Sequence, residues 1–439
     1  MDIVSAAATP PSPPTPPTPP DAGERELVVR SGIVQRVGRL SLSAGTGSYR
    51  VKASMARVAA ALGIERHQAL VTLTEITTTS HRGDSFRTEV SEVRSVGVNA
   101  NRLAELERHA RGFEEAARER QVTPQEVSAD LDRIEAEPPL YSAALNGLWS
   151  GIACAGFSFL NGGGPIEIIA VFVGATAGQL LRRALLHRGL NQFGVTMLAA
   201  LLASVTYLAF VSALQGLGAT STEHAAGYIS SVLFLIPGFP LVTGALDLAR
   251  LDFSAGLSRL TYALMILMSA ALAVWGMSVV AGVSPDDAVG TPVTPGLLLV
   301  LRFLASFVGI LGFALLFNSP WRMAVAAAGV GMVANVGRIY LVEQHVPVQA
   351  AAAAAALVVG IVAAYVAPRL DVPRVTIAVP AVVIMVPGVT AYRAIYHLSN
   401  DSTTDALAYA VQAGLVVAAL SIGLAVARMI TDPAWTFER

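Results

Sequence analysis

The chain has 439 residues, of which 54% are hydrophobic and only 14% are charged, and its mean hydropathy is +0.57. Soluble globular proteins carry about 25% charged residues, so the composition favours a membrane protein. The formal net charge of −1 argues against a strongly basic nucleic-acid-binding surface, and no nucleic acid is expected as a partner. The single cysteine, Cys154, excludes a disulfide within the chain and a thiolate metal cluster.

The first third of the chain divides into a tail and a soluble region. Residues 1–23 include alternating Pro, Ser and Thr from Pro10 to Pro20, which favours a solvated, disordered tail. Residues 24–138 have the charge density of a soluble domain. The spacing from Ser54 to Leu62 predicts a helix, and the β-branched run from Ala69 to Thr79 predicts a strand. We therefore predict a soluble α+β domain.

Two further helices are predicted before the membrane region begins. The amphipathic pattern from Asn99 to Arg120 predicts the first of them. Thr123 and Glu126 form a capping box, with Pro124 at the first helical position, and they predict the second helix to about Ala136. The prolines at positions 138 and 139 then mark the end of the domain.

Beyond residue 139 the apolar runs become long enough to cross a bilayer, because about 20 helical residues cross ~30 Å of hydrocarbon. We predict an all-α membrane region of about ten transmembrane helices, five in residues 139–290 and five in residues 291–432. The predicted spans are Ser142–Leu160, Ile166–Leu181, Phe193–Leu214, Ala226–Leu246, Leu257–Val283, Leu297–Phe317, Met323–Val342, Gln349–Ala367, Val375–Ile395 and Ala406–Ile430.

The distribution of arginine predicts that both termini are cytoplasmic, because cytoplasmic loops carry an excess of basic residues. With the N-terminus inside, the cytoplasmic loops hold Arg182, Arg183, Arg188, Arg250, Arg259, Arg322, Arg369 and Arg374. The external loops hold Glu223, Asp286, Asp287, Glu343, Asp401 and Asp405.

Two motifs of the first membrane half recur in the second. Ile236-Pro237-Gly238 recurs as Val386-Pro387-Gly388. The series Gly156-Phe157, Pro165, Gly174 and Arg183 recurs as Gly312-Phe313, Pro320, Gly329 and Arg338. Since each half holds an odd number of helices, the second half must be inverted relative to the first. The sequence therefore predicts two five-helix inverted repeats, an architecture found in many secondary transporters.

The two Pro-Gly pairs fall about halfway through their spans. Proline lacks the N–H of a helical residue, so Pro237-Gly238 and Pro387-Gly388 are predicted to free the carbonyls of Leu233 and Val383. Two interpretations stay open at this point. Each pair is either an ordinary kink or a helix break that lines a wet cavity and binds ionic groups. The presence of a matching pair favours the breaks.

Polar side chains within or beside the predicted spans are candidate substrate-binding or coupling residues, because hydrocarbon offers them no partner. Glu167 enters the second span and is interpreted either as a partner for a substrate ammonium group or as a favourable charge at a helix N-terminus. Asn161 opens a Gly-rich connection that is either a plain turn or a vestibule. The remaining candidates are Asp247, Asn146, Asn335 and Arg393. For Asp247 and Arg393 a second interpretation stays open, in which the side chain reaches the membrane interface.

Enzymatic and ATP-driven mechanisms find no support in the sequence. Gly45-Thr46-Gly47 lacks the Lys-Ser/Thr of a phosphate-binding loop, and no Walker A motif occurs. The histidines and carboxylates of the soluble domain match no metal-ligand or catalytic-triad spacing. No cofactor and no metal are therefore expected.

The order of these features resembles the bacterial threonine/serine exporter family, in the long form that fuses both membrane halves. The resemblance rests on the soluble α+β domain, the Asn-Gly-rich first connection, LIPGFPLVTGALDLARLDFSAGLSRL and VPGVTAYRAIY, and it covers roughly Ser31 to Arg428. It implies an inner-membrane carrier that exports small hydroxy amino acids with the proton motive force.

Three classes of function are weighed. The leading one is a secondary transporter that exports threonine or serine with protons as the coupling ion. The alternatives are a membrane-anchored cytoplasmic hydrolase, and a sensor or scaffold whose soluble domain recruits a partner. The lipid bilayer is a partner in every case, and oligomers are compatible with each.

Overall fold

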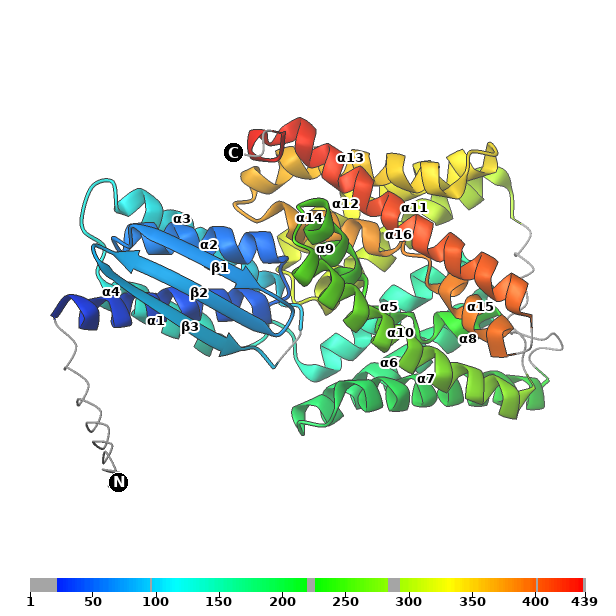
Figure 1. Ribbon diagram of the computed structural model, residues 1–439. Coiled ribbons are helices and arrows are strands. Elements are labelled where there is room, and N and C mark those ends of the chain that lie inside the picture. The colour runs from blue at the N-terminus through cyan, green and yellow to red at the C-terminus, as the bar shows by residue number, and fades with distance from the viewer. Residues whose placement is uncertain (1–21, 95–96, 219–225, 283–292, 400–401, 437–439) are drawn as a thin grey trace, which may run out of the picture.

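We analysed a computed structural model of the chain, which describes residues 22–94, 97–218, 226–282, 293–399 and 402–436. A region that contains a small sheet precedes a body of long apolar helices (Figure 1). The predicted tail therefore lies almost wholly outside the described residues, as does the predicted boundary between the membrane halves at residue 290. The same is true of four predicted external-loop residues, Glu223, Asp286, Asp287 and Asp401.

The soluble region is an α+β unit with its own hydrophobic core. Its three strands pair antiparallel in the order β1-β2-β3, and the buried core runs from Leu27 to Ile134. Its elements are α1 (Ala22–Ser43), α2 (Ser48–Ala61), β1 (Arg66–Val71), β2 (Glu75–Arg82), β3 (Ser85–Glu92), α3 (Ala100–Ala116) and α4 (Pro124–Ala136). Helix α1 and strand β3 were not predicted from the sequence, whereas helices α2, α3 and α4 were.

The single strand predicted from Ala69 to Thr79 is wrong, because the chain reverses within it. The backbone N–H of Thr72 donates to the carbonyl of Glu75 at 2.9 Å, and the Glu75 N–H donates to the Thr72 hydroxyl at 3.1 Å. This local turn separates β1 from β2 and makes them a hairpin. The predicted cap of α4 is confirmed, since Thr123 accepts a hydrogen bond from the Glu126 N–H at 3.3 Å.

Among the residues that the structure describes, eight helices are long and apolar enough to cross a membrane. Two further pairs of helices pass the same test but are bent, and counting each pair as one span gives up to ten. The long helices are α5 (Ala143–Leu160), α6 (Pro165–His187), α7 (Gln192–Gly216), α10 (Phe253–Ala281), α11 (Pro295–Leu316), α12 (Trp321–Glu343), α13 (Val348–Arg369) and α16 (Thr403–Thr431).

The two bent pairs coincide with the fourth and ninth predicted spans. The first comprises α8 (Ala226–Ser230), the short 3-10 helix η1 (Leu233–Leu235) and α9 (Gly238–Ala249), and it bends by 61°. The second comprises α14 (Arg374–Val383) and α15 (Gly388–Ser399), and it bends by 51°. A last short helix, α17 (Pro433–Thr436), follows α16.

The outer surface of the helical body is apolar. Large side chains such as Leu264, Val279, Leu304, Leu407 and Ile422 are each more than half exposed. A water-soluble protein rarely exposes so much continuous apolar surface, whereas lipid tails solvate it at no cost. Together with the long helices, this surface establishes a multi-pass membrane protein.

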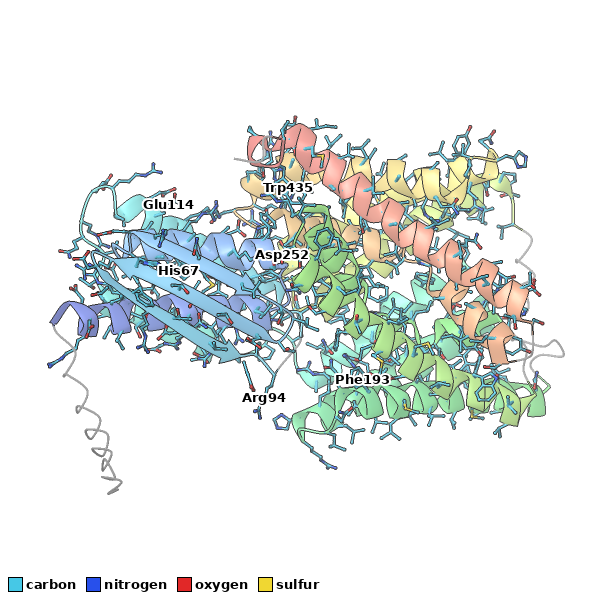
Figure 2. All side chains as sticks on the ribbon, viewed as in Figure 1. His67, Arg94, Glu114, Phe193, Asp252 and Trp435 are labelled. Carbon is cyan, nitrogen blue, oxygen red and sulfur yellow. The ribbon has the colours of Figure 1, made fainter. Side chains whose placement is uncertain are left out.

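The soluble region docks on one end of the helical body through the N-termini of two helices. At the start of α2 the Ser48 N–H donates to the carboxylate of Asp247 at 3.0 Å. At the start of α3 the Ala100 N–H donates to the carbonyl of Phe317 at 3.0 Å. The C-terminal end of the chain reaches the same place, where Trp435 lies close to the soluble region (Figure 2). Helix-terminal N–H groups that would otherwise lack partners are thereby satisfied.

Candidate functional site at the two helix breaks

The two Pro-Gly pairs form the same tight turn. The Gly238 N–H donates to the carbonyl of Ile236 at 2.8 Å, and the Gly388 N–H donates to the carbonyl of Val386 at 2.8 Å. Pro237 has φ −79° and ψ 57°, which are the dihedral angles of an inverse γ-turn. Each turn ends one half-helix and starts another in a new direction, so both spans are true breaks and not smooth kinks.

The carbonyls that were predicted to be free at these breaks are occupied. Leu233 accepts a hydrogen bond from the Ile236 N–H at 3.1 Å, and Val383 accepts one from the Val386 N–H at 3.1 Å. The prediction is wrong because the last turn before each proline tightens from α-helical to 3-10 geometry. This tightening supplies a donor three residues on, in place of the one that proline removes.

The two breaks pack directly against each other. A Cβ atom on Gly238 would lie 3.1 Å from Cγ2 of Val383, and a Cβ on Gly388 would lie 2.9 Å from Cδ2 of Leu233 and closer still to Ile236. The contacts are reciprocal, because each glycine meets the residue five positions before the other glycine. A side chain at Gly388 would force Leu233 or Ile236 to move, and one at Gly238 would press against Val383.

A second reciprocal contact joins α5 and α11. A Cβ on Gly156 would lie 2.8 Å from the carbonyl oxygen of Ala305 and 3.1 Å from Cα of Gly309. In turn, a Cβ on Gly312 would lie 2.8 Å from the backbone nitrogen of Ala153. Residues that come later in α5 therefore meet residues that come earlier in α11, so the two helices run antiparallel at close range.

Two small cavities flank the breaks. One of about 40 Å³ is lined by Leu233, Ile236, Gly388 and Tyr392, between η1, α10 and α15. The other, also of about 40 Å³, lies between α9, α13, α14 and α16 and reaches Asp247. Both have room for a few water molecules and not for an amino acid. The conformation is therefore closed around the breaks.

Glu167 stands in the first turn of α6, against α8, which lies at the end of the body remote from the soluble region (Figure 1). The residue is buried, with 9% of its surface exposed. A Cβ on Gly227 would lie 2.9 Å from Cβ of Glu167 and 2.5 Å from the Tyr207 hydroxyl. Glu167 and Tyr207 thus both lie against the start of the first bent span.

Asp247 lies near the opposite end of the same bent span. Its carboxylate pairs with Nε of Arg259 at 3.0 Å, and the two side chains are 1% and 2% exposed. The Ser48 N–H of the soluble region is a further donor to it, as described above. The structure therefore separates the two acidic candidates, and Asp247 is already paired.

Most of the arginines assigned to cytoplasmic loops lie within helices or at their ends. Arg182 and Arg183 lie within α6, which continues to His187, beyond the predicted end at Leu181. Arg259 lies within α10, inside the predicted span Leu257–Val283, where it is buried and pairs with Asp247. This pairing keeps the Arg259 charge out of lipid.

The two candidate asparagines belong to separate buried networks. Asn146 accepts from the side-chain amide of Gln179 at 2.7 Å and donates to the carbonyl of Leu316 at 3.2 Å, which ties α5 to α6 and α11. Asn335 donates to Ser306 at 2.9 Å and accepts from Arg338 at 3.1 Å, which ties α12 to α11. In this conformation both asparagines hold helices together.

The last two candidates lie away from the breaks. Asn161 is exposed at the end of α5, and its amide donates to the carbonyl of Phe157 at 2.8 Å. Arg393 stands on α15 beyond the second break, with its guanidinium 6.0 Å from the centre of the Tyr409 ring. Pro237, Gly238, Pro387 and Gly388 are thus the predicted residues that the fold brings together.

Buried tyrosines near the breaks were not predicted. Tyr207 and Tyr228 are at most 1% exposed, and their ring centres lie 6.4 Å apart. The Tyr228 hydroxyl donates to the carbonyl of Val274 at 2.6 Å. A hydroxyl-bearing aromatic residue inside an apolar run was the available signal, because a buried tyrosine needs a hydrogen-bond partner. Among the described residues no three His, Cys, Asp or Glu side chains gather as metal ligands.

Two interrupted spans that pack on each other within a multi-pass helical body define a membrane transporter. Comparison with known families agrees. A model described as "Putative threonine/serine exporter" matches residues 32–281, and one described as "Threonine/Serine exporter, ThrE" matches residues 302–430. The chain belongs to the threonine/serine exporter family, in the form that carries both membrane halves. Its family is one of transporters and not of enzymes.

Individual relatives cover most of the chain. A "Threonine/serine exporter" of Corynebacterium glutamicum is 27% identical over 97% of this chain and 88% of its own length. A "Probable threonine/serine exporter" of Mycobacterium tuberculosis is 25% identical over 91% of this chain and 75% of its own. A "Probable succinate transporter subunit YjjP" of Escherichia coli is 26% identical over 55% of this chain and 92% of its own. No solved structure matches the chain.

Proposed function

We propose that this protein is a secondary transporter that exports threonine and serine across the inner membrane of a bacterium, in exchange for protons. The substrate class is supported by the similarity to an exporter of that name over 97% of the chain. An ion gradient is the remaining energy source because the sequence carries no nucleotide-binding loop. Both termini then face the cytoplasm, as the arginine distribution favours.

The observation that carries the proposal is the reciprocal packing of the two breaks. Gly238 meets Val383 and Gly388 meets Leu233, so exchanging the two breaks reproduces the contact. The contacts of Gly156 with Gly309 and of Gly312 with Ala153 exchange in the same way. A two-fold axis in the membrane plane produces such pairs. They support two inverted repeats of five helices, in residues 139–290 and 291–432, with the substrate site on the axis.

The breaks offer suitable chemistry for a zwitterionic amino acid. The helices α9 and α15 begin at Gly238 and Gly388, and helix N-termini favour a carboxylate. The ammonium group and the coupling proton require an acid, and we assign both to Glu167. Asp247, which already has partners, is assigned to closing the end that faces the soluble region.

The family also contains a relative named for succinate, so the substrate is the first thing to test. Cells that overproduce the protein are loaded with labelled threonine, serine or succinate, and efflux is followed against cells without it. The proposal predicts faster efflux of threonine and serine and unchanged efflux of succinate. Faster efflux of succinate alone would replace the amino-acid substrate with a dicarboxylate.

A further inference from the structure

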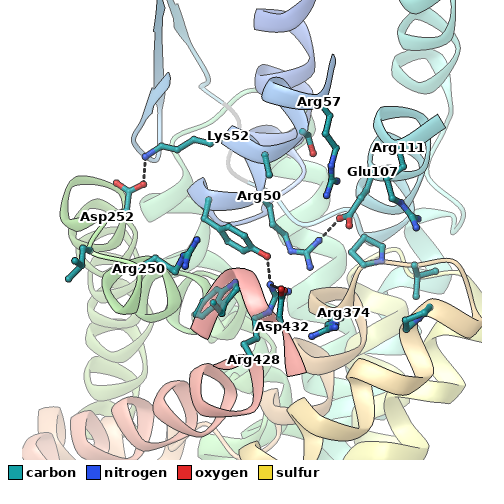
Figure 3. Close-up of a pocket in the computed structure, with 18 residues that line it drawn as sticks. Arg50, Lys52, Arg57, Glu107, Arg111, Arg250, Asp252, Arg374, Arg428 and Asp432 are labelled. Atoms are coloured by element: carbon teal, nitrogen blue, oxygen red, sulfur yellow. Dashed lines mark hydrogen bonds and ion pairs between the residues drawn. The ribbon is translucent and has the colours of Figure 1, made fainter. Parts of the chain in front are cut away.

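A cavity of about 720 Å³ lies where the soluble region meets the ends of the membrane helices (Figure 3). Its walls come from α2 and α3 on one side, and from the ends of α9, α13 and α16 with the start of α14 on the other. Seven basic residues line it, namely Arg50, Lys52, Arg57, Arg111, Arg250, Arg374 and Arg428. Three acidic residues line it as well, namely Glu107, Asp252 and Asp432.

The acidic residues near the cavity do not balance the basic ones. Arg50 pairs with Glu107, and Lys52 pairs with Asp252 (Figure 3). Two more basic residues reach acids outside the lining, Arg57 to Glu114 at 3.3 Å and Arg111 to Asp371 at 2.7 Å. With those two acids included, the cavity still holds two more positive than negative charges. Since the whole chain has a net charge of −1, this excess is local.

The excess charge is held in place by aromatic rings. The guanidinium carbon of Arg250 lies 4.8 Å from the Trp435 ring centre, and that of Arg428 lies 5.2 Å from both Trp435 and Tyr49. Arg374 donates to the hydroxyl of Thr431 at 2.9 Å, which is an uncharged partner. Stacking restrains a guanidinium in a fixed orientation, and Arg428 is held further by the Tyr49 hydroxyl and by Asp432 at 3.9 Å.

The pKa of Tyr49 indicates a positive electrostatic potential in the cavity. Burial by itself would raise the pKa of this phenol, but the positive charges of Arg50 and Arg428 outweigh burial and lower the pKa below its ordinary value. Tyr49 belongs to the soluble region, outside the membrane spans. A phenol whose anionic form is favoured despite burial indicates a positive potential at this place.

We propose that this cavity binds a phosphate group of a small molecule or a lipid, clamped between Arg50 of the soluble region and Arg250, Arg374 and Arg428 of the helical body. A phosphate monoester carries about −1.5 to −2 charges, which matches the excess of two. Its several oxygens accept hydrogen bonds from guanidinium groups on both walls at once. A carboxylate has only one negative charge and two oxygens, so it fits the cavity less well. The cavity also leaves room for the remainder of a metabolite-sized ligand.

Such a ligand would join the two parts of the protein. All four basic residues of the soluble wall, Arg50, Lys52, Arg57 and Arg111, pair with acids, so the excess of positive charge lies on the wall made by the helical body, at Arg250, Arg374 and Arg428. A phosphate group that accepts from these arginines and from Arg50 bridges the two walls and stabilises the docked arrangement. Binding therefore raises the thermal stability of the whole chain, independently of any transport.

The test uses the purified full-length protein in neutral detergent at low salt, without magnesium, titrated with inorganic pyrophosphate. We expect a saturable rise in melting temperature that weakens as salt screens the charges. Arg374→Gln and Arg250→Gln should each weaken the apparent affinity about tenfold, since a hydrogen bond to a charged group is lost. Arg57→Gln is a milder variant, because the Arg57 side chain is 35% exposed.

Arg322→Gln is the matched control, because Arg322 is exposed at the start of α12 and does not line the cavity. A second arm places the protein in nanodiscs of phosphatidylglycerol or of phosphatidylcholine. Stabilisation by pyrophosphate identifies a soluble ligand, and stabilisation by phosphatidylglycerol alone, lost in Arg374→Gln, identifies a lipid headgroup. No effect of either, an equal effect of succinate, or equal responses of the cavity variants and the control would overturn the proposal. Transport is not measured, so the result does not depend on the substrate proposed above.

Discussion

Gly388 lies so close to Leu233 of the other broken span that a Cβ on the glycine would come within 2.9 Å of the leucine Cδ2. A change in the angle of one break is therefore expected to press on the other. In a transporter whose halves rock against each other, such a contact would couple the two halves at the breaks.

A valine at Gly388 is expected to disturb this coupling. The new side chain would overlap Leu233 and Ile236, and overpacking of this kind costs about 1–3 kcal/mol. We expect Gly388→Val to reduce threonine efflux about tenfold or more while the protein still inserts. Gly414→Val on α16 is the control, since a Cβ there meets nothing within 4 Å. Equal efflux from the two variants would show that the breaks move independently.

The close approach of α5 and α11 leads to a prediction about stability. A Cβ at Gly312 meets backbone atoms of Trp149 and Ala153, which cannot move aside as a flexible side chain does. Gly312→Ala should lower the melting temperature in detergent, by an amount that corresponds to about 1–3 kcal/mol. Gly329→Ala, in open space on α12, should leave it unchanged or raise it. An equal response to both would contradict the assigned helix contact.

The buried pair of Asp247 and Arg259 predicts a non-additive effect. Asp247→Asn leaves a buried guanidinium without its counter-charge, at a cost of about 3–5 kcal/mol. The double variant Asp247→Leu with Arg259→Met removes both charges and should be more stable than Asp247→Asn. Hydrogen exchange should also become faster at Ser48 in Asp247→Asn, because an amide oxygen is a weaker acceptor for its N–H than the carboxylate. A double variant that melts below the single one would argue against the pair.

The predicted topology can be checked with reporter fusions at two described loops. Gly218 follows α7 at the end remote from the soluble region and should be external, whereas Gly189 follows α6 and should be cytoplasmic. An alkaline phosphatase fusion should be active at Gly218 and inactive at Gly189. The opposite pattern would place both termini outside the cell. The direction of transport inferred from the predicted topology would then be reversed.

Apolar run length predicted the membrane helices well, because a single helix of about 20 apolar residues has few alternatives in a bilayer. The positions of both breaks were predicted for a similar reason, since proline removes one specific hydrogen bond. The state of the Leu233 and Val383 carbonyls was not predicted, because a tightened turn replaces the lost donor from three residues on. The local sequence does not show whether the turn before a proline will tighten in this way.

Long-range pairs were beyond what the sequence could predict. The pairing of Arg259 with Asp247 was not predicted, because Asp247 precedes it on another helix and only packing brings the two together. Tyr49 and Trp435 lie far apart in the sequence, and yet the centres of their rings are 5.4 Å apart. The individual candidates Asn146 and Asn335 were identified correctly as buried polar groups, but their roles depend on which neighbours the fold supplies.

We propose that the protein exchanges protons for threonine or serine through the breaks, and that Glu167 carries the coupling proton. Glu167→Gln keeps the shape and hydrogen-bonding capacity of the side chain but removes its proton, so it separates coupling from folding. The control is Glu343→Gln, which removes an acid at the end of α12, distant from the breaks in sequence. Gln179→Glu is not a suitable control, because Gln179 donates a hydrogen bond to Asn146.

The most direct measurement uses purified protein in liposomes loaded with labelled threonine, with an imposed pH gradient and with a protonophore as the second condition. We expect the gradient to accelerate threonine release by wild-type protein and by Glu343→Gln. The protonophore should abolish this acceleration, and Glu167→Gln should not respond to the gradient. Release by Glu167→Gln at the wild-type rate, or wild-type release that ignores the protonophore, would contradict the proposal.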